Sequence, residues 1–133
     1  MQTWRIDELD APQDKLRCPT AVSISLVAQS LMRYKGFTRF EHYGWDACYM
    51  DGKHHANDQP DVGGVVQTFT IQDEAGKVFY SVETSAPWLA ELHDAKLQAF
   101  NLHTMGYEIV VHGTGAVANL LKITNLAKTP DLP

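Results

Sequence analysis

The sequence has few cysteines, which excludes small proteins that are stabilised by several disulfide bonds or by a structural zinc ion. Cys18 and Cys48 are the only cysteines among 133 residues, and they form no CxxC pair. A structural zinc site needs a set of Cys and His ligands at short spacing. The start of the chain is charged at once and contains no apolar signal-peptide core. We therefore expect two unbonded thiols in a reducing compartment, and a cytoplasmic protein.

Long apolar runs and basic clusters are also missing. No run approaches the roughly 18 apolar residues of a membrane helix, so we expect no membrane partner. The formal net charge is −5, and the densest basic group, Arg33, Lys35 and Arg39, is too sparse for a phosphate-binding surface. We therefore expect no nucleic-acid partner. Length and an apolar fraction of 44% fit one globular domain over residues 1–133.

Motifs of catalysis and metal binding are missing too. There is no nucleophile elbow, Walker motif or HExxH. Residues 51–64 contain metal-ligand types, but neighbouring side chains such as His54 and His55 point apart in an extended segment. We expect a mobile loop there, with no metal and no cofactor. No triad spacing connects the remaining histidines: His42, His93, His103 and His112.

The clearest local pattern lies between Ser85 and His112. Ser85 is a suitable N-cap, Pro87 fits the first helical turn, and Gly106 is a typical left-handed stop. Apolar residues recur between them at helical spacing: Trp88, Leu92, Ala95, Ala99 and Leu102. This pattern predicts a helix with one buried face. The alternation from Tyr107 to His112 predicts a strand after it.

A second helix is predicted for residues 21–35. Thr20 is its expected N-cap and Gly36 its stop. Its apolar stripe consists of Ile24, Val27, Ala28, Leu31 and Tyr34. A strand through residues 22–26 is the competing interpretation. We prefer the helix because the periodic run is long and its end signal is clear.

Three further segments have the pattern of strands. Residues 2–8 and 65–73 alternate apolar and polar side chains, as strands do. Residues 78–82 are predicted to pair with residues 65–73 as the second strand of a hairpin. The predicted fold is α+β: a two-layer sandwich with a mostly antiparallel sheet and two helices on one face, in the order β-α-β-β-β-α-β-(β). This order resembles the duplicated βαββ ligand-binding domains that accompany some bacterial transcription regulators, and the resemblance implies the fold alone. Residues 128–133 are expected to form a loose tail.

Glycines after the last predicted strand have the spacing of a dinucleotide fingerprint. Gly113, Gly115 and Ala118 match GxGxxA, and a helix beginning there could bind a phosphate at its N-terminus. Only fifteen residues follow Ala118, which is too few for the helix, strand and ribose-binding acid of that fold. Residues 116–124 could form a strand or a short helix. We favour a tight glycine turn within a hairpin.

Residues 37–50 carry five aromatic side chains and are expected to form a strand with a bulge at Gly44. Aromatic rings beside carboxylates suit an organic cation. We predict a ligand-binding site formed by Glu41, Tyr43, Trp45, Asp46 and Tyr49. The predicted function is therefore a non-enzymatic small-molecule-binding domain, expected to be a homodimer. The alternatives are a protein-interaction module that uses the aromatic strand, and a small enzyme with a His/Asp pair.

Overall fold

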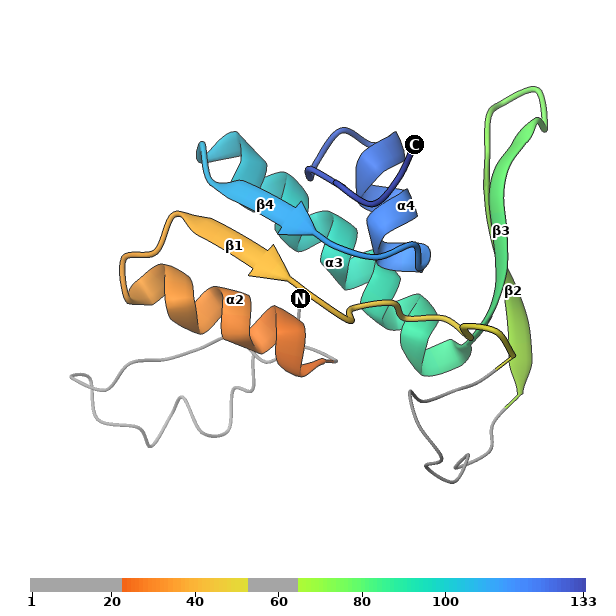
Figure 1. Ribbon diagram of the computed structural model, residues 1–133, viewed down its shortest axis with the longest axis horizontal. Coiled ribbons are helices and arrows are strands. Elements are labelled where there is room, and N and C mark those ends of the chain that lie inside the picture. Colours follow the sequence, from red (N-terminus) through yellow and green to blue (C-terminus); the bar gives the residue numbers. More distant parts are fainter. Residues whose placement is uncertain (1–22, 53–64) are drawn as a thin grey trace, which may run out of the picture.

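A computed structural model describes residues 23–52 and 65–133, which form three helices, one parallel pair of strands and one antiparallel pair (Figure 1). The elements are α2 (Ile24–Tyr34), β1 (Arg39–His42), β2 (Val66–Gln72), β3 (Val78–Ser85), α3 (Ala86–Thr104), β4 (Glu108–Val111) and α4 (Ala116–Ile123). The predicted α+β class is confirmed. The predicted strand at residues 2–8 and most of the predicted loop 51–64 lie outside the described residues.

Strands β1 and β4 pair in parallel, with Phe40 opposite Ile109 and His42 opposite Val111. Parallel neighbours need a long connection, and here it contains the hairpin β2–β3 and the helix α3. Phe40, Ile109 and Val111 are buried in one core with residues of α3 and α4. Backbone hydrogen bonds from Lys128 to Ile109 and from Val111 to Lys128 add the C-terminal segment to the other edge of β4.

The predicted single, mostly antiparallel sheet is not what the described strands form. β2 and β3 make a separate two-stranded sheet, in which Phe69 pairs with Val82 and Ile71 with Tyr80. This hairpin is the one predicted from the sequence, and Figure 1 shows it projecting beyond the helices. Alternating apolar and polar residues predict that a segment is a strand, but they do not predict which strand it pairs with in the sheet. The pairing of β1 with β4 joins residues that are far apart in the sequence, such as Phe40 and Ile109.

Helix α3 agrees with the sequence analysis at both ends and along its buried face. It begins after the N-cap Ser85 and is followed by Gly106 with φ of +80°. Four members of the predicted stripe are buried: Leu92, Ala95, Ala99 and Leu102. Trp88 is half-buried and makes an edge-to-face contact with Tyr49. Ser85 occupies the N-cap position without a side-chain capping hydrogen bond. The first-turn proline and the left-handed glycine are therefore the local features that mark the ends of this helix.

Helix α2 begins later than predicted and packs with a different face. Its N-cap is Ser23, whose hydroxyl accepts a hydrogen bond from the Leu26 amide, and the side chains that it buries are Leu26 and Gln29. The predicted apolar stripe lies mostly outside this contact, and Ile24 is 81% exposed. Gln98 of α3 donates to the Gln29 side chain at 2.6 Å and to the Leu26 carbonyl at 3.0 Å. A buried amide network therefore accompanies the observed orientation of α2.

Helix α4 corrects the interpretation of residues 113–124. The glycines do not turn a hairpin; they connect β4 to a helix that begins at Ala116. Most of its residues are buried against the rest of the fold: Ala116, Val117, Ala118, Leu120 and Leu121. The helix has only eight residues, and so short an apolar run does not separate a buried helix from a strand, which explains the error.

Candidate functional site

The ends of the parallel strands bring two loops together. Residues 43–46 follow β1, and residues 112–115 follow β4. The carboxyl ends of parallel strands meet at one edge of a sheet, which is where α/β proteins often bind ligands. The structure therefore directs attention to this edge and to the outer face of β1 beside it.

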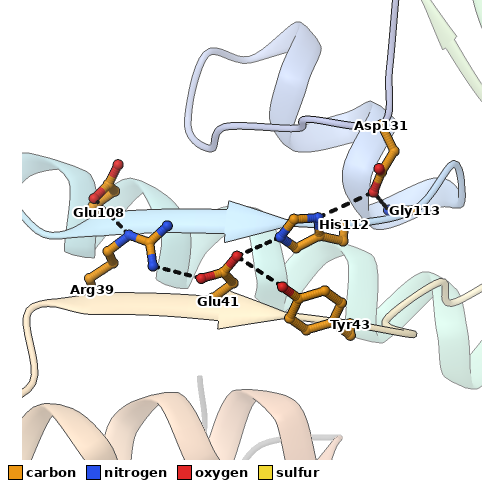
Figure 2. A network of polar contacts seen from close by, with 7 residues as sticks. All are labelled: Arg39, Glu41, Tyr43, Glu108, His112, Gly113 and Asp131. Atoms are coloured by element: carbon orange, nitrogen blue, oxygen red, sulfur yellow. Dashed lines mark hydrogen bonds and ion pairs between the residues drawn. The ribbon is translucent and has the colours of Figure 1, made fainter.

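Glu41 is the centre of a polar network on the outer face of β1 (Figure 2). Its carboxylate accepts hydrogen bonds from Arg39 at 2.6 Å and from the Tyr43 hydroxyl at 3.1 Å. It also lies 2.6 Å from His112 Nε2. Hydrogen bonds from His112, Arg39 and Tyr43 lower the pKa of Glu41 to about 2. We call the set Arg39, Glu41, Tyr43, His112 and Asp131 the Glu41 network.

His112 connects β1 to the C-terminal segment. Its ring stacks on Tyr43, with ring centroids 4.2 Å apart and planes within 4° of parallel. Its Nδ1 lies 3.3 Å from Asp131 Oδ2, and the same oxygen accepts the Gly113 amide at 2.7 Å. Both sides of the ring are thus tied to carboxylates.

Arg39 and Glu108 extend the network along the sheet. Arg39 Nε lies 3.1 Å from Glu108 Oε2. The other carboxylate oxygen of Glu108, Oε1, forms an ion pair with Lys128. The hydrogen bond from Lys128 is the main cause of a lowered pKa of Glu108. Ion pairs on an exposed surface contribute about 0–1 kcal/mol each to stability. Their main effect here is to hold Arg39 in one orientation.

The five predicted ligand-binding residues do not gather in one place. Glu41 and Tyr43 lie together on the outer face, whereas Trp45 is buried and donates its indole N–H to Glu91 at 2.6 Å. Gly44 separates them with φ of +68°, which ends the strand and breaks its alternation. Tyr49 lies elsewhere, beside Trp88 at the start of α3. The expected bulge at Gly44 is thus a strand end that turns Trp45 inward.

Asp46, the remaining predicted residue, lies against the glycine turn that precedes α4. Its carbonyl accepts hydrogen bonds from the Ala116 and Val117 amides at 2.9 and 3.3 Å. Its carboxylate also approaches Gly115, and burial raises the pKa of that carboxyl group. The first amides of α4 therefore already have a partner, and a carboxylate lies beside them. This arrangement leaves no open phosphate site of the kind that GxGxxA suggests.

Sequence reasoning missed Arg39, His112 and Asp131 as members of the Glu41 network, and it missed Gly113 beside them. One signal was available for His112, because β4 alternates and places it on the same face as Glu108. Using it required the parallel pairing with β1. No local pattern marks Asp131, since its contact depends on the path of the chain after α4. The sequence analysis therefore identified two of the five members of the network, Glu41 and Tyr43.

Behind the sheet, buried polar groups connect β1 to α2. The Gln29 amide nitrogen lies 2.8 Å from His42 Nε2, and burial lowers the pKa of His42. Cys48 is a buried free thiol, as expected, and burial raises its pKa. Cys18 lies outside the described residues. Gln29 and Cys48 are buried and His42 is half-buried, and none of the three belongs to the Glu41 network.

Comparisons with protein-family models, with curated protein sequences and with solved structures found no match. Within residues 23–52 and 65–133, no group of three or more His, Cys, Asp and Glu side chains is arranged to hold a metal ion. Among the helices that the structure describes, none is long and apolar enough to cross a membrane. The Glu41 network is thus the feature from which a function can be inferred.

Proposed function

We propose that the chain is a non-enzymatic binding domain that recognises an organic cation on the exposed ring of Tyr43. The ring is 72% exposed, yet its stacking on His112 and its hydrogen bond to Glu41 hold it in one orientation. This fixed and open aromatic face is the observation that carries the proposal. Cations bind the faces of aromatic rings, and such contacts contribute about 0.5–1 kcal/mol at exposed sites.

The charges around Tyr43 support a cationic rather than an anionic ligand. Tyr43 donates its hydroxyl to Glu41, a carboxylate that stays ionised down to a pH near its pKa of about 2. Arg39 balances that charge, but it approaches Glu41 from the side away from Tyr43 (Figure 2). Asp131 adds a second carboxylate, and the whole chain has a net charge of −5. A negative protein attracts cations by long-range electrostatics.

The geometry of His112 supports a binding role over a catalytic one. A general base needs a nitrogen within reach of a substrate proton, whereas each nitrogen of His112 faces a carboxylate of the protein. Cys48 is no better as a nucleophile, because it is buried and its pKa is raised rather than lowered. The side chains around Tyr43 therefore fix the orientation of its ring, which suits binding rather than catalysis.

A protein side chain is the second candidate source of the cation. Arg39 and Tyr43 are both exposed on one face, and these residue types are enriched in protein interfaces. Both are already fixed by the network, which reduces the entropy lost on binding. A Lys or Arg of a partner, including a second copy in the expected homodimer, would meet the same ring. A free small cation covers less surface and should bind with only about millimolar affinity.

NMR titration with tetramethylammonium chloride tests the proposal directly. The Tyr43 ring resonances should shift saturably, while sodium chloride at equal ionic strength should not shift them. Tyr43→Phe keeps the ring, and its ring resonances should still respond. In Tyr43→Leu the backbone amide of residue 43, which should also shift in the wild-type protein, should no longer respond. Glu41→Gln should weaken the response. A wild-type response equal to that in sodium chloride would refute the proposal.

The source of the cation requires a second titration. A short lysine-containing peptide should bind more tightly than tetramethylammonium if the natural ligand is a protein. A second copy as partner should make the Tyr43 shifts depend on protein concentration, and sedimentation should then show a dimer that Tyr43→Leu weakens. Equal affinity for peptide and free cation, with no concentration dependence, would favour a small organic cation.

A further inference from the structure

We infer that Gly113 and His112 form a carboxylate-binding site, which the chain's own Asp131 fills in this structure. Asp131 Oδ2 accepts the backbone N–H of Gly113 at 2.7 Å and lies 3.3 Å from His112 Nδ1. The Gly113 amide, by a hydrogen bond, and the His112 ring, at ion-pair distance, therefore both face one carboxylate oxygen. Charge-assisted hydrogen bonds of this kind are among the strongest in proteins. The site is separate from the first amides of α4, which donate to Asp46.

The donors are held in place by the two strands and not by Asp131. His112 directly follows β4, its backbone amide donates to the His42 carbonyl at 2.9 Å, and its ring contacts Glu41 and Tyr43. Gly113 has φ of +112°, a conformation that L-residues rarely adopt, and it directs the amide toward the carboxylate. Both donors should therefore keep their positions when Asp131 leaves.

Asp131 itself is held by few contacts. Its side chain is 49% exposed. Lys128 anchors the segment before it through backbone hydrogen bonds to β4. Beyond Lys128, Leu132 is partly buried and the Pro133 carbonyl accepts a hydrogen bond from Lys122. Residues 129–133 thus act as an internal ligand, which competes through its high effective concentration with carboxylates from outside.

The charges at the site define the ligand as a single carboxylate group. Two carboxylates already contact the His112 ring: Glu41 lies beside Nε2 and Asp131 lies beside Nδ1. An additional carboxylate would be repelled by both of these negative charges. An incoming carboxylate must therefore replace Asp131. This carboxylate site is separate from the open face of Tyr43. A negative result for cation binding at Tyr43 would therefore not refute it.

Chemical rescue of Asp131→Ala in the full chain tests the inference. The Gly113 amide resonance should move when Asp131 is removed, and sodium acetate should return it saturably toward its wild-type position. Sodium chloride at the same ionic strength should have no such effect. Wild-type protein should not respond to the same acetate concentrations, because its site is filled. Asp131→Asn, whose amide oxygen still accepts from Gly113, should respond less than Asp131→Ala.

Two results would overturn the inference. One is an Asp131→Ala protein that is folded, with dispersed amide resonances, but whose Gly113 amide does not respond to acetate. The other is an equal acetate response in wild type and Asp131→Ala, which would indicate a contact elsewhere. A peptide of sequence TPDLP, with TPNLP as control, distinguishes the ligand source. Tighter binding of TPDLP than of acetate would indicate a protein carboxylate, and equal binding would indicate a small acid.

Discussion

Replacing Gly115 with alanine tests how closely the turn before α4 packs on Asp46. An added Cβ would lie 2.6 Å from Asp46 Oδ1 and 2.7 Å from Asp46 Cα. The side-chain oxygen can rotate away, but Cα belongs to a backbone that is hydrogen-bonded to the first amides of α4. The φ of Gly115 is −76°, which alanine adopts readily. The effect of the substitution should therefore come from the contact and not from backbone strain.

The expected loss of stability follows from the size of this overlap. The Cβ–Cα distance is 0.7 Å shorter than the 3.4 Å at which ordinary contacts begin, so one backbone segment must move. Overpacking of this kind costs about 1–3 kcal/mol. Alanine is also a poorer N-cap than glycine, which adds roughly a few tenths of a kcal/mol to the loss. We expect Gly115→Ala to lower the free energy of unfolding by about 2 kcal/mol.

Urea unfolding monitored by fluorescence measures this change, provided that the m-value stays constant. Asp46→Ala in the same background is the matched control, since it removes the carboxylate but leaves Cα in place. If the backbone contact dominates, Asp46→Ala should not restore the stability of Gly115→Ala. A Gly115→Ala protein within about 0.5 kcal/mol of wild type would refute the close packing of Asp46 on this turn.

Three further predictions concern the core and the Glu41 network. Leu26→Ala should lower the free energy of unfolding by about 2–5 kcal/mol, whereas Ile24→Ala, on the exposed stripe of α2, should change it by less than about 0.5 kcal/mol; equal losses in urea unfolding would mean that α2 packs by its apolar stripe. Trp45→Phe should cost about 1–3 kcal/mol, because it leaves the buried Glu91 carboxylate without its indole donor. Because the pKa of Glu41 is depressed to about 2, its contribution to stability is present above its unfolded pKa of about 4.3 and is lost as pH falls toward 2. The carboxyl carbon of Glu41 should titrate near pH 2 by NMR, and Glu41→Gln should flatten this part of the stability profile; a midpoint above pH 4 would contradict the network.

Local chemistry made several elements predictable. Pro87 and Gly106 mark the two ends of α3 because the fixed φ of proline and the left-handed φ of glycine depend on the residue itself and its neighbours in sequence. The hairpin turn is equally local: the Lys77 amide donates to the Asp73 side chain at 2.8 Å. Such signals involve residues only a few positions apart. They reveal where helices and strands lie without revealing which of them meet.

The candidate site depends on contacts that have no local signal. Tyr43 and Trp45 share one parity in the sequence, yet the positive φ of Gly44 sends them to opposite sides of the sheet. Glu41 meets His112 only because β1 pairs with β4 in parallel. The amphipathic pattern of α2 likewise predicts a helix but not its orientation. Gln98, a residue of another helix, contacts α2 on the side of Gln29.

The long path between β1 and β4 has a consequence for synthesis of the chain. Within the described residues β1 pairs only with β4, and Arg39 meets Glu108 across 69 positions. At roughly 5–20 residues per second, a ribosome needs several seconds to make the intervening chain. The hairpin and α3 can form in that interval, since their contacts are local. The Phe40 side chain, however, has no Ile109 to pack against until β4 has been made, so this part of the core should form only after the hairpin and α3.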